Sequence, residues 1–177
     1  MKTGERWLGL AAVLVLAVVG TAQAELVAHW NFNEGTGTTA TDVTTNGYDG
    51  ALTNVTWTTG LGGTAAYFDG VPADVGDSWI TINDPTDALS PGDLSSGVGG
   101  WSFSCWFKVE LWYPYQVLFW KQTDATNFCF IRIQSGGEVR FHYEINDIRY
   151  LTHYSLPAVV SGAWNHVVIA IDASEPE

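Results

Sequence analysis

Two acidic residues, Glu144 and Asp147 in the segment HYEINDIRY, come closest in this sequence to a pair of catalytic carboxylates. A retaining glycoside hydrolase needs two carboxyl groups about 5 Å apart. Alternate positions on one face of a strand supply that spacing, whereas residues three apart on a strand point to opposite faces. The sequence also has no serine nucleophile motif, and its four histidines are isolated from one another. We therefore expect a protein that is not an enzyme.

A short aromatic segment, LWYPYQ at positions 111–116, places Trp112, Tyr113 and Tyr115 around a proline. The proline favours a loop at this position. Aromatic rings in a loop can stack on sugar rings, and exposed apolar patches usually mark contact surfaces. These three residues are therefore candidate ligand-binding residues for a carbohydrate. The alternative is that they fold back over the edge of the core or begin the next strand.

The chain has two cysteines, Cys105 in the segment WSFSCWFK and Cys129 in the segment FCFIRI. Alternation places Cys105 on the same face as the aromatic residues at 101, 103 and 107, and it places Cys129 opposite Phe130 and Arg132. If both cysteine faces point into the core, the sulfurs can meet in a disulfide, which an exported protein permits. The alternative is two buried free thiols. Two cysteines without clustered histidines do not suggest zinc.

The segments around these residues are typical of strands and turns throughout. Large apolar residues alternate with polar ones, and Asn-Gly, Asp-Gly and Ser-Gly pairs separate the runs. The clearest hairpin is IRIQSGGEVRFHYEI, and no window has a sustained helical stripe. We expect an all-β, antiparallel sandwich or barrel. The expected strands are LVAHWNF, GALTNVTWT, AAYFDG, SWITIN, WSFSCWFKVE, QVLFWKQ, NFCFIRIQ, EVRFHYEI, RYLTHYS and WNHVVIAID.

The first 24 residues have the layout of a secretory signal peptide. Lys2 and Arg6 precede an apolar run from Trp7 to Val19, and Ala22-Gln23-Ala24 is a small-x-small cleavage site. The run is shorter than the roughly 20 residues of a membrane-spanning helix. We expect residues 1–24 to be removed, leaving residues 25–177 as one domain that is secreted, periplasmic or at the cell surface. The alternative is an uncleaved membrane anchor.

The charge of the chain limits its partners. The chain has 19 acidic and 7 basic residues, a formal net charge of -12. The basic residues after the leader are scattered in the sequence, and nucleic acids are bound by clustered Lys and Arg. We therefore expect no nucleic-acid partner. No second apolar run is long enough to span a membrane, so no membrane span is expected after cleavage.

Six segments, taken in order, resemble the concanavalin A-like superfamily in its laminin-G-like and pentraxin-like branch. They are LVAHWNFNEGTGTTATD, NGYDGAL, AAYFDGV, WITI, WSFSCWFK and WNHVVIAID, and they extend from Leu26 to Asp172. The resemblance implies an antiparallel β-sandwich of the jelly-roll type for residues 25–177. The family continues beyond the last segment with a hairpin and several closing strands, whereas this sequence stops at Glu177. We expect the closing strands to be missing, either because the sequence is a fragment or because the sandwich has an open edge.

The same resemblance implies calcium, because laminin-G-like and pentraxin-like relatives often bind it. Calcium takes six to eight oxygen ligands from carboxylates, carbonyls and water. The acids in the matched segments are Glu34, Asp42, Asp49, Asp69 and Asp172. The expected metal ligands among them are Glu34, Asp42, Asp69 and Asp172. The alternative is that these carboxylates serve turns or solvation. In either case the glycines between Glu34 and Gly50 indicate an ordered loop.

From these observations we expect an exported, non-catalytic binding or adhesion module. Its partner would be a polysaccharide or another extracellular surface, with calcium stabilising the loops. The alternative is a structural or protein–protein interaction domain of a larger exported protein, with no small ligand. A glycoside hydrolase is a third and least favoured possibility.

Overall fold

The computed structural model describes residues 25–69, 77–91, 100–113, 116–145, 148–154 and 159–172. Every regular element in these ranges is a β-strand, and neighbouring strands pair in the antiparallel sense. None of the described segments forms a helix long and apolar enough to cross a membrane. The expected leader, residues 1–24, lies outside the described residues.

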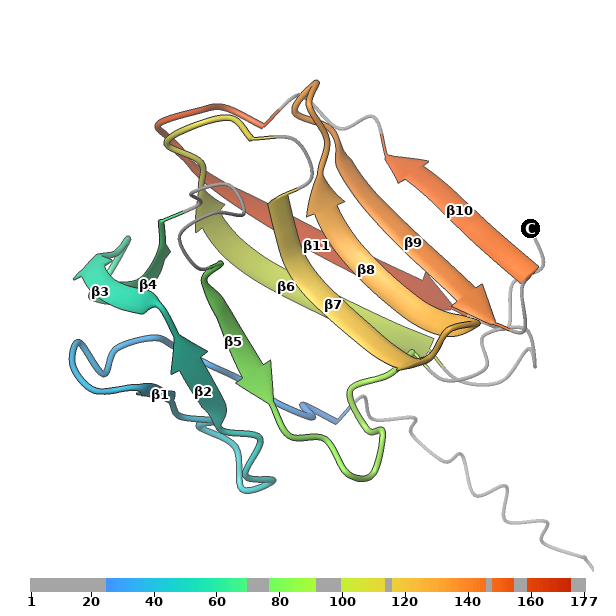
Figure 1. Cartoon of the computed structure of the whole chain (residues 1–177), viewed down its shortest axis with the longest axis horizontal. Coiled ribbons are helices and arrows are strands. Elements are labelled where there is room, and N and C mark those ends of the chain that lie inside the picture. The colour runs from blue at the N-terminus through green and yellow to red at the C-terminus, as the bar shows by residue number, and fades with distance from the viewer. Residues whose placement is uncertain are drawn as a thin grey trace, which may run out of the picture.

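The largest sheet has four strands in the order β10-β9-β8-β7 (Figure 1). Its strands are β7 (Gln116–Asp124), β8 (Asn127–Ile133), β9 (Val139–Ile145) and β10 (Ile148–Tyr154). Consecutive strands pair with one another, so the sheet is a meander of hairpins. The predicted hairpin at the Gly136-Gly137 pair is confirmed: the backbone N–H of Gln134 donates to the carbonyl of Glu138 at 2.8 Å.

A second sheet of two long strands, β6 (Gly100–Lys108) and β11 (Trp164–Asp172), lies behind the first in Figure 1. The core fills the space between these two sheets. Trp101 of β6 contacts Phe119 of β7 and Phe141 of β9, with ring centroids 5.7 Å and 5.8 Å apart. The buried cluster is made of Phe107, Val109, Cys129, Ile131, Ile133, Val139, Phe141, Tyr143, Val159, Val167 and Ile169.

The N-terminal part of the chain forms two smaller sheets beside this pair of layers (Figure 1). One has the order β1-β2-β5, and the other pairs β3 with β4. The strands are β1 (Thr39–Ala40), β2 (Gly50–Thr53), β3 (Val55–Thr59), β4 (Thr64–Phe68) and β5 (Trp79–Ile82). The all-β prediction is confirmed for the described residues, and the arrangement is compatible with a β-sandwich.

The strand expected at residues 26–32 is reduced to one isolated bridge between Trp30 and Asp42. Two local features explain the difference. The backbone N–H of His29 donates to the carboxylate of Asp42 at 3.0 Å, so a side chain takes the place of a ladder partner. Phe32 has a φ of 53°, in the left-handed region, where an extended strand cannot continue.

Candidate functional site

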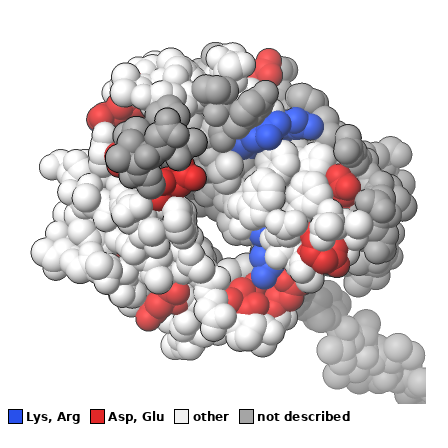
Figure 2. Space-filling view, viewed as in Figure 1, with Lys and Arg blue, Asp and Glu red and all other residues white. Residues whose placement is uncertain are grey.

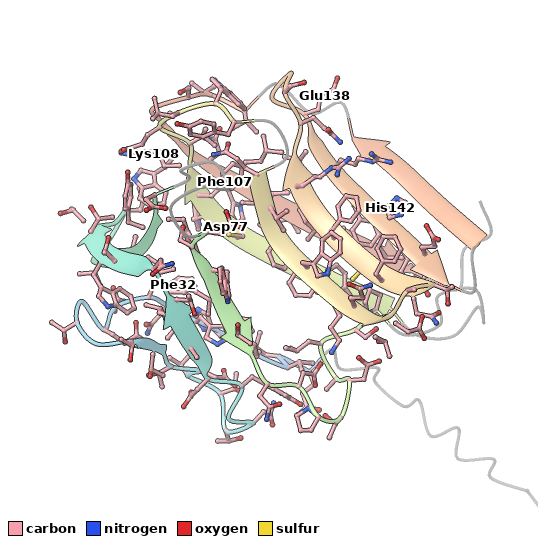
Figure 3. The ribbon with its side chains drawn as sticks, in the orientation of Figure 1. Phe32, Asp77, Phe107, Lys108, Glu138 and His142 are labelled. Carbon is pink, nitrogen blue, oxygen red and sulfur yellow. The ribbon has the colours of Figure 1, made fainter. Side chains whose placement is uncertain are left out.

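The outer face of the four-stranded sheet carries large aromatic and charged side chains. Alternation along β8 and β9 places one set of residues in the core and the other set on this outer face. Figure 3 shows His142 of β9 on the face that is turned toward the viewer, away from β6 and β11. We call this surface the aromatic face. Its members are Trp120, Phe128, Phe130, Arg132, Arg140, His142 and Glu144.

Three rings form a row across three strands. Trp120, Phe130 and His142 are register neighbours on β7, β8 and β9. The Trp120 and Phe130 ring centroids are 5.5 Å apart with planes 7° from parallel, and those of Phe130 and His142 are 4.8 Å apart with planes 16° from parallel. Phe128 stacks beside both ends of the row, 5.9 Å from Trp120 and 5.3 Å from His142. The result is a set of nearly parallel rings on one surface.

The row is exposed mainly at its Trp120 end. Trp120 is 51% exposed, whereas Phe130 and His142 are each 5% exposed because their neighbours enclose them. The buried rings hold the tryptophan in one orientation through the contacts just described. Trp120 is therefore a fixed apolar surface that is open to solvent, which is the arrangement of a contact residue.

A β-bulge directs Trp120 outward. Strict alternation in the run Val117 to Trp120 would put Leu118 and Trp120 on one face. The register of β7 against β8 shifts between Val117 and Phe119, so Leu118 and Phe119 both pack against the core. Trp120 then lies opposite Phe130 on the outer face. Bulges are frequent where a side chain must be re-aimed next to a functional site.

Charged groups lie at the two ends of the aromatic face. Arg132 and Arg140 are register partners at one end, with guanidinium carbons 4.6 Å and 5.8 Å from the centre of the Phe130 ring. At the other end, Glu144 is the register partner of Phe128. The Glu144 carboxylate lies 3.4 Å from Nε2 of His142, and both side chains are buried. The face therefore offers cationic, aromatic and acidic groups in sequence along the strands.

A pocket of about 220 Å³ opens at the acidic end of this face. Phe128 and Glu144 line it from the aromatic face, and Lys121, Tyr143 and Asp87 line it from the core side and from the segment before β6. The pocket therefore lies where the end of the aromatic face meets the core side of the sheet.

The predicted aromatic loop lies at another place in the molecule. Trp112 is 41% exposed and packs against the turn between β8 and β9, since a Cβ added at Gly137 would lie 3.1 Å from its ring. Tyr113 is half-buried. Tyr115 lies outside the described residues. Trp112 thus contacts this turn and is also exposed, and ligand binding by the segment stays a prediction.

Among the predicted calcium ligands, Asp42 is already fully used by the protein. Its Oδ1 accepts hydrogen bonds from the backbone N–H groups of His29 and Thr44, both at 3.0 Å. Its Oδ2 accepts from the Thr44 hydroxyl at 2.7 Å and from the Tyr48 N–H at 3.1 Å. Burial raises the pKa of Asp42, but these hydrogen bonds lower it by more, to about 2. The carboxylate therefore organises the loop from Glu34 to Gly50.

The other three predicted ligands lie in separate segments. Oε1 of Glu34 accepts a hydrogen bond from Thr41 N–H at 2.7 Å, and its Oε2 is buried without a hydrogen-bond partner. Asp69 accepts from the Ser78 hydroxyl at 3.2 Å, and Asp172 is exposed at the end of β11. Among the residues that the structure describes, no three His, Cys, Asp or Glu side chains form a group that could hold a metal ion. Calcium binding stays a prediction.

Cys105 and Cys129 are free thiols. Both belong to the inner faces of their strands, as alternation predicted, with Cys129 in the buried core and Cys105 packed against it. Burial raises the pKa of Cys105 to about 11 and that of Cys129 to about 12. Both thiols are therefore protonated at neutral pH, which makes them poor nucleophiles and metal ligands. The disulfide is not formed in this structure.

Sequence reasoning missed the aromatic face as a site, although part of its signal was present. In NFCFIRI and VRFHYEI, both alternating sets contain large side chains, so neither face of these strands is simply polar. That two-faced pattern indicates a second packed or binding surface. The position of Trp120 depends on the bulge, which the alternation pattern does not contain.

Comparison with known proteins finds no matching family model, no matching curated protein and no matching solved structure. The laminin-G-like resemblance therefore stays a prediction from the sequence motifs. The function has to be argued from the geometry of the aromatic face.

Proposed function

We propose that this protein is an exported, non-catalytic module with a concanavalin A-like jelly-roll fold, and that it binds a polysaccharide on its aromatic face. The observation that carries the proposal is the row of Trp120, Phe130 and His142, with a fixed and half-exposed tryptophan at one end. Polar groups with hydrogen-bonding capacity surround this row. That combination matches a ligand with apolar ring faces and many hydroxyl groups.

Binding follows from two contributions. The C–H face of a sugar ring covers the exposed face of Trp120, and burying a large aromatic side chain contributes about 1.5–3 kcal/mol. Arg132 and Arg140, which are partly exposed, then hydrogen-bond to ring substituents, and these bonds fix the orientation of the sugar. Trp120 is the exposed ring of the row, so the aromatic contact is made with one sugar ring of the polymer.

The test is binding of soluble polysaccharides to the processed protein and to a Trp120→Ala variant, measured by affinity electrophoresis and titration calorimetry. We expect the variant to bind about tenfold or more weakly, because it loses the apolar surface that the sugar covers. The matched control is Trp106→Ala. Trp106 is 54% exposed and stacks on His166, but it lies on the outer face of the sheet formed by β6 and β11. Equal affinities of the two variants would overturn the proposal.

The role of calcium is tested in the same experiment. The predicted ligands Glu34, Asp42, Asp69 and Asp172 lie outside the proposed contact, so binding should persist in EDTA. Loss of binding in EDTA with restoration by calcium would mean that a metal takes part in recognition.

A second candidate function, protein–protein interaction, is favoured by the exposed apolar residues Trp106 and Val168 on the outer face of β6 and β11. Exposed apolar patches of this kind are typical of contact surfaces between proteins. Self-association in analytical ultracentrifugation that Trp106→Ala abolishes, together with no polysaccharide binding, would favour this function over the first.

A further inference from the structure

We infer that an extended, positively charged segment of another protein pairs with the free edges of β5 and β7, and that it joins the sheet of β5 to the sheet of β7. This inference goes beyond the proposed function and is independent of sugar binding. Its basis is two strand edges that face each other across a hollow in the molecule, next to core aromatic residues that are only partly buried.

The strands β5 and β7 are each the last strand of a sheet. β5 ends the order β1-β2-β5, and β7 ends the order β10-β9-β8-β7. Figure 1 shows that the free edge of β5 is turned toward β7 and the free edge of β7 toward β5. In the part of the chain that the structure describes, no strand pairs with either edge. Figure 2 shows the surface hollowed between the N-terminal sheets and the four-stranded sheet.

One added strand can pair with both edges at once. Figure 1 shows β5 and β8 running in opposite directions, and β7 is antiparallel to β8, so β5 and β7 run in the same direction. A strand that lies between them and runs the opposite way is antiparallel to both. The added strand then forms one continuous antiparallel sheet with β1, β2 and β5 on one side and β7 to β10 on the other. Strand addition of this kind is a common mode of peptide recognition.

The backbone of β5 directs hydrogen-bonding groups toward this hollow. The N–H of Leu52 in β2 donates to the carbonyl of Thr38 at 2.9 Å, so Leu52 turns its backbone groups away from β5. Leu52 is the register partner of Ile80, so Ile80 likewise turns its N–H and C=O groups away from β2. Ile82, two residues further along the strand, has the same orientation. These donors and acceptors are the template for an added strand.

The core is incompletely covered next to these edges. Inner-facing residues of β8 and β11 are enclosed: Ile131 is 0% exposed and Ile169 is 3% exposed. In the end strands β6 and β7, by contrast, Trp101, Phe103 and Phe119 are only partly buried. The ring of Phe119 contacts those of Trp101 and Phe103, with centroids 5.7 Å and 5.5 Å apart. Apolar side chains on the inner face of an added strand cover these rings, and that burial favours binding.

Charge determines the chemistry of the partner. The formal net charge of -12 makes two copies of the chain repel each other, and it attracts a cationic segment. Asp77 lies just before β5, beside the hollow, where Figure 3 labels it. At the other end of β5, Asp84 and Asp87 share the single ammonium group of Lys121. We therefore expect a partner strand in which apolar residues alternate with lysine or arginine, with the apolar set facing the core.

The experiment uses a synthetic peptide of the same length as β7, 9 residues, in which valine alternates with lysine or threonine. Titration calorimetry measures its binding to the processed protein. One control peptide has the same composition in scrambled order, and a second has the same sequence with N-methyl groups on alternate backbone nitrogens, which block one of its two edges. We expect each control to bind about tenfold or more weakly, because alternation or several hydrogen bonds are lost. Equal binding of the three peptides, or no binding of the alternating peptide, overturns the inference.

Amide hydrogen exchange, measured by NMR, locates the contact. The Ile80 and Ile82 amides point toward the hollow, so we expect their exchange to slow about tenfold or more when the alternating peptide is bound. The Thr81 amide points toward β2 and is the internal control, with little expected change. Equal slowing at Ile80 and Thr81 would report general stabilisation of the fold and would contradict strand addition.

Two charge-reversal variants test the local role of charge. Asp77→Lys places a cation beside the hollow and should weaken binding of the alternating peptide about fivefold. The matched control is Glu138→Lys, which makes the same change of net charge at an exposed position in the turn between β8 and β9 (Figure 3). If both variants weaken binding equally, only the net charge matters and the peptide is not held at this hollow.

A second copy of the chain is the competing occupant of the two edges. Analytical ultracentrifugation of the protein without peptide distinguishes the two. We expect a monomer in which the Ile80 and Ile82 amides exchange freely. A dimer in which these amides are protected overturns the assignment to a cationic partner. None of these results depends on sugar binding, so the polysaccharide proposal is tested separately.

Discussion

A single buried carboxylate organises the loop that joins the N-terminal segment to β2. Asp42 accepts four hydrogen bonds, from His29, Thr44 and Tyr48, and its own backbone N–H donates to Asp49 at 2.8 Å. These bonds connect residues that are 13 and 6 positions away from Asp42. A hydrogen bond to a charged group contributes about 1.5–3 kcal/mol, and several of them here share one ion. The loop therefore depends on this one charge.

We predict that Asp42→Asn destabilises the protein by about 2 kcal/mol at pH 7, because an amide has one acceptor oxygen in place of two. The pKa gives a similar figure. The pKa of Asp42 falls from 3.8 to about 2 on folding. The contribution of this carboxylate to the free energy of unfolding is therefore fully present above pH 3.8 and is lost as the pH falls toward 2. Urea unfolding at a series of pH values measures both effects.

The matched control for Asp42 is Asp69→Asn. Asp69 is exposed and accepts one hydroxyl hydrogen bond, from Ser78. The Asp69→Asn substitution should change the free energy of unfolding by less than about 0.5 kcal/mol. If the two variants had the same acid unfolding curve as the native protein, Asp42 would not be the organising charge.

At the scale of strands, alternation predicts some faces correctly and fails where pairing between distant segments decides. It placed Cys105 on the inner face of β6 and Arg132 on the outer face of β8, because both strands keep a regular register. It failed at Trp120, since the β7 bulge arises from packing Leu118 and Phe119 together against the core. The three consecutive large residues after Val117 signal an irregularity, but not its position.

The candidate site was less predictable than the fold for the same reason. An aromatic loop can be found from a few adjacent letters, and Trp112 was found in that way. The row of Trp120, Phe130 and His142 draws one residue from each of three strands, so it exists only after the strands have paired. Strand pairing depends on contacts between residues far apart in the chain, which one sequence without its partners does not specify.

The turn between β8 and β9 gives a prediction at this scale. Gly137 has a φ of 81° and lies against Trp112 and Val159, whereas Gly136 has open space around its Cα. We predict that Gly137→Ala costs about 1–2 kcal/mol through the strained backbone, with a further contribution from the Trp112 ring. Gly136→Ala should stay within about 0.5 kcal/mol of the native protein.

Thermal and urea unfolding measure the stabilities of the two glycine variants. Both variants differ from the native protein by the same added methyl group, so a difference in stability between them reports backbone conformation and local space. Equal stabilities would mean that the turn adapts without strain.

At the scale of the whole molecule, one short segment connects the N-terminal sheets with the two core layers. This segment, residues 84–90, follows β5 and contacts both parts of the protein. Tyr48, in the loop before β2, shares a hydrogen bond with Thr86 at 3.2 Å. The Asp84 carboxylate accepts a hydrogen bond from the ammonium group of Lys121 on β7 at 2.8 Å. Asp87 forms an ion pair with the same ammonium group at 2.9 Å. The segment thus contacts β7 through the ion pair of Asp84 with Lys121, and it contacts the loop before β2 through the Tyr48 hydroxyl.

Asp84 is buried more deeply than its partner. Its side chain is 3% exposed, and the backbone N–H groups of Ala88 and Leu89 also donate to it. Burial raises the pKa of Asp84, but Lys121 and these two N–H groups lower it by more. The carboxylate thus stays ionised in the core region, and its charge needs the lysine.

We predict that Lys121→Met destabilises the protein by about 3 kcal/mol at pH 7, because it leaves a buried carboxylate without its cation. Lys108→Met is the matched control: Lys108 pairs with Glu110 at the surface, where an ion pair contributes about 1 kcal/mol or less. Because the pKa of Asp84 is lowered on folding, the ion pair stabilises the protein above the ordinary pKa of 3.8 and this stabilisation is lost in acid. The difference between the two variants in urea unfolding should therefore shrink as the pH falls below 4. A difference that is absent at pH 7, or unchanged in acid, would mean that the two parts of the molecule are held together by apolar packing instead of this charge pair.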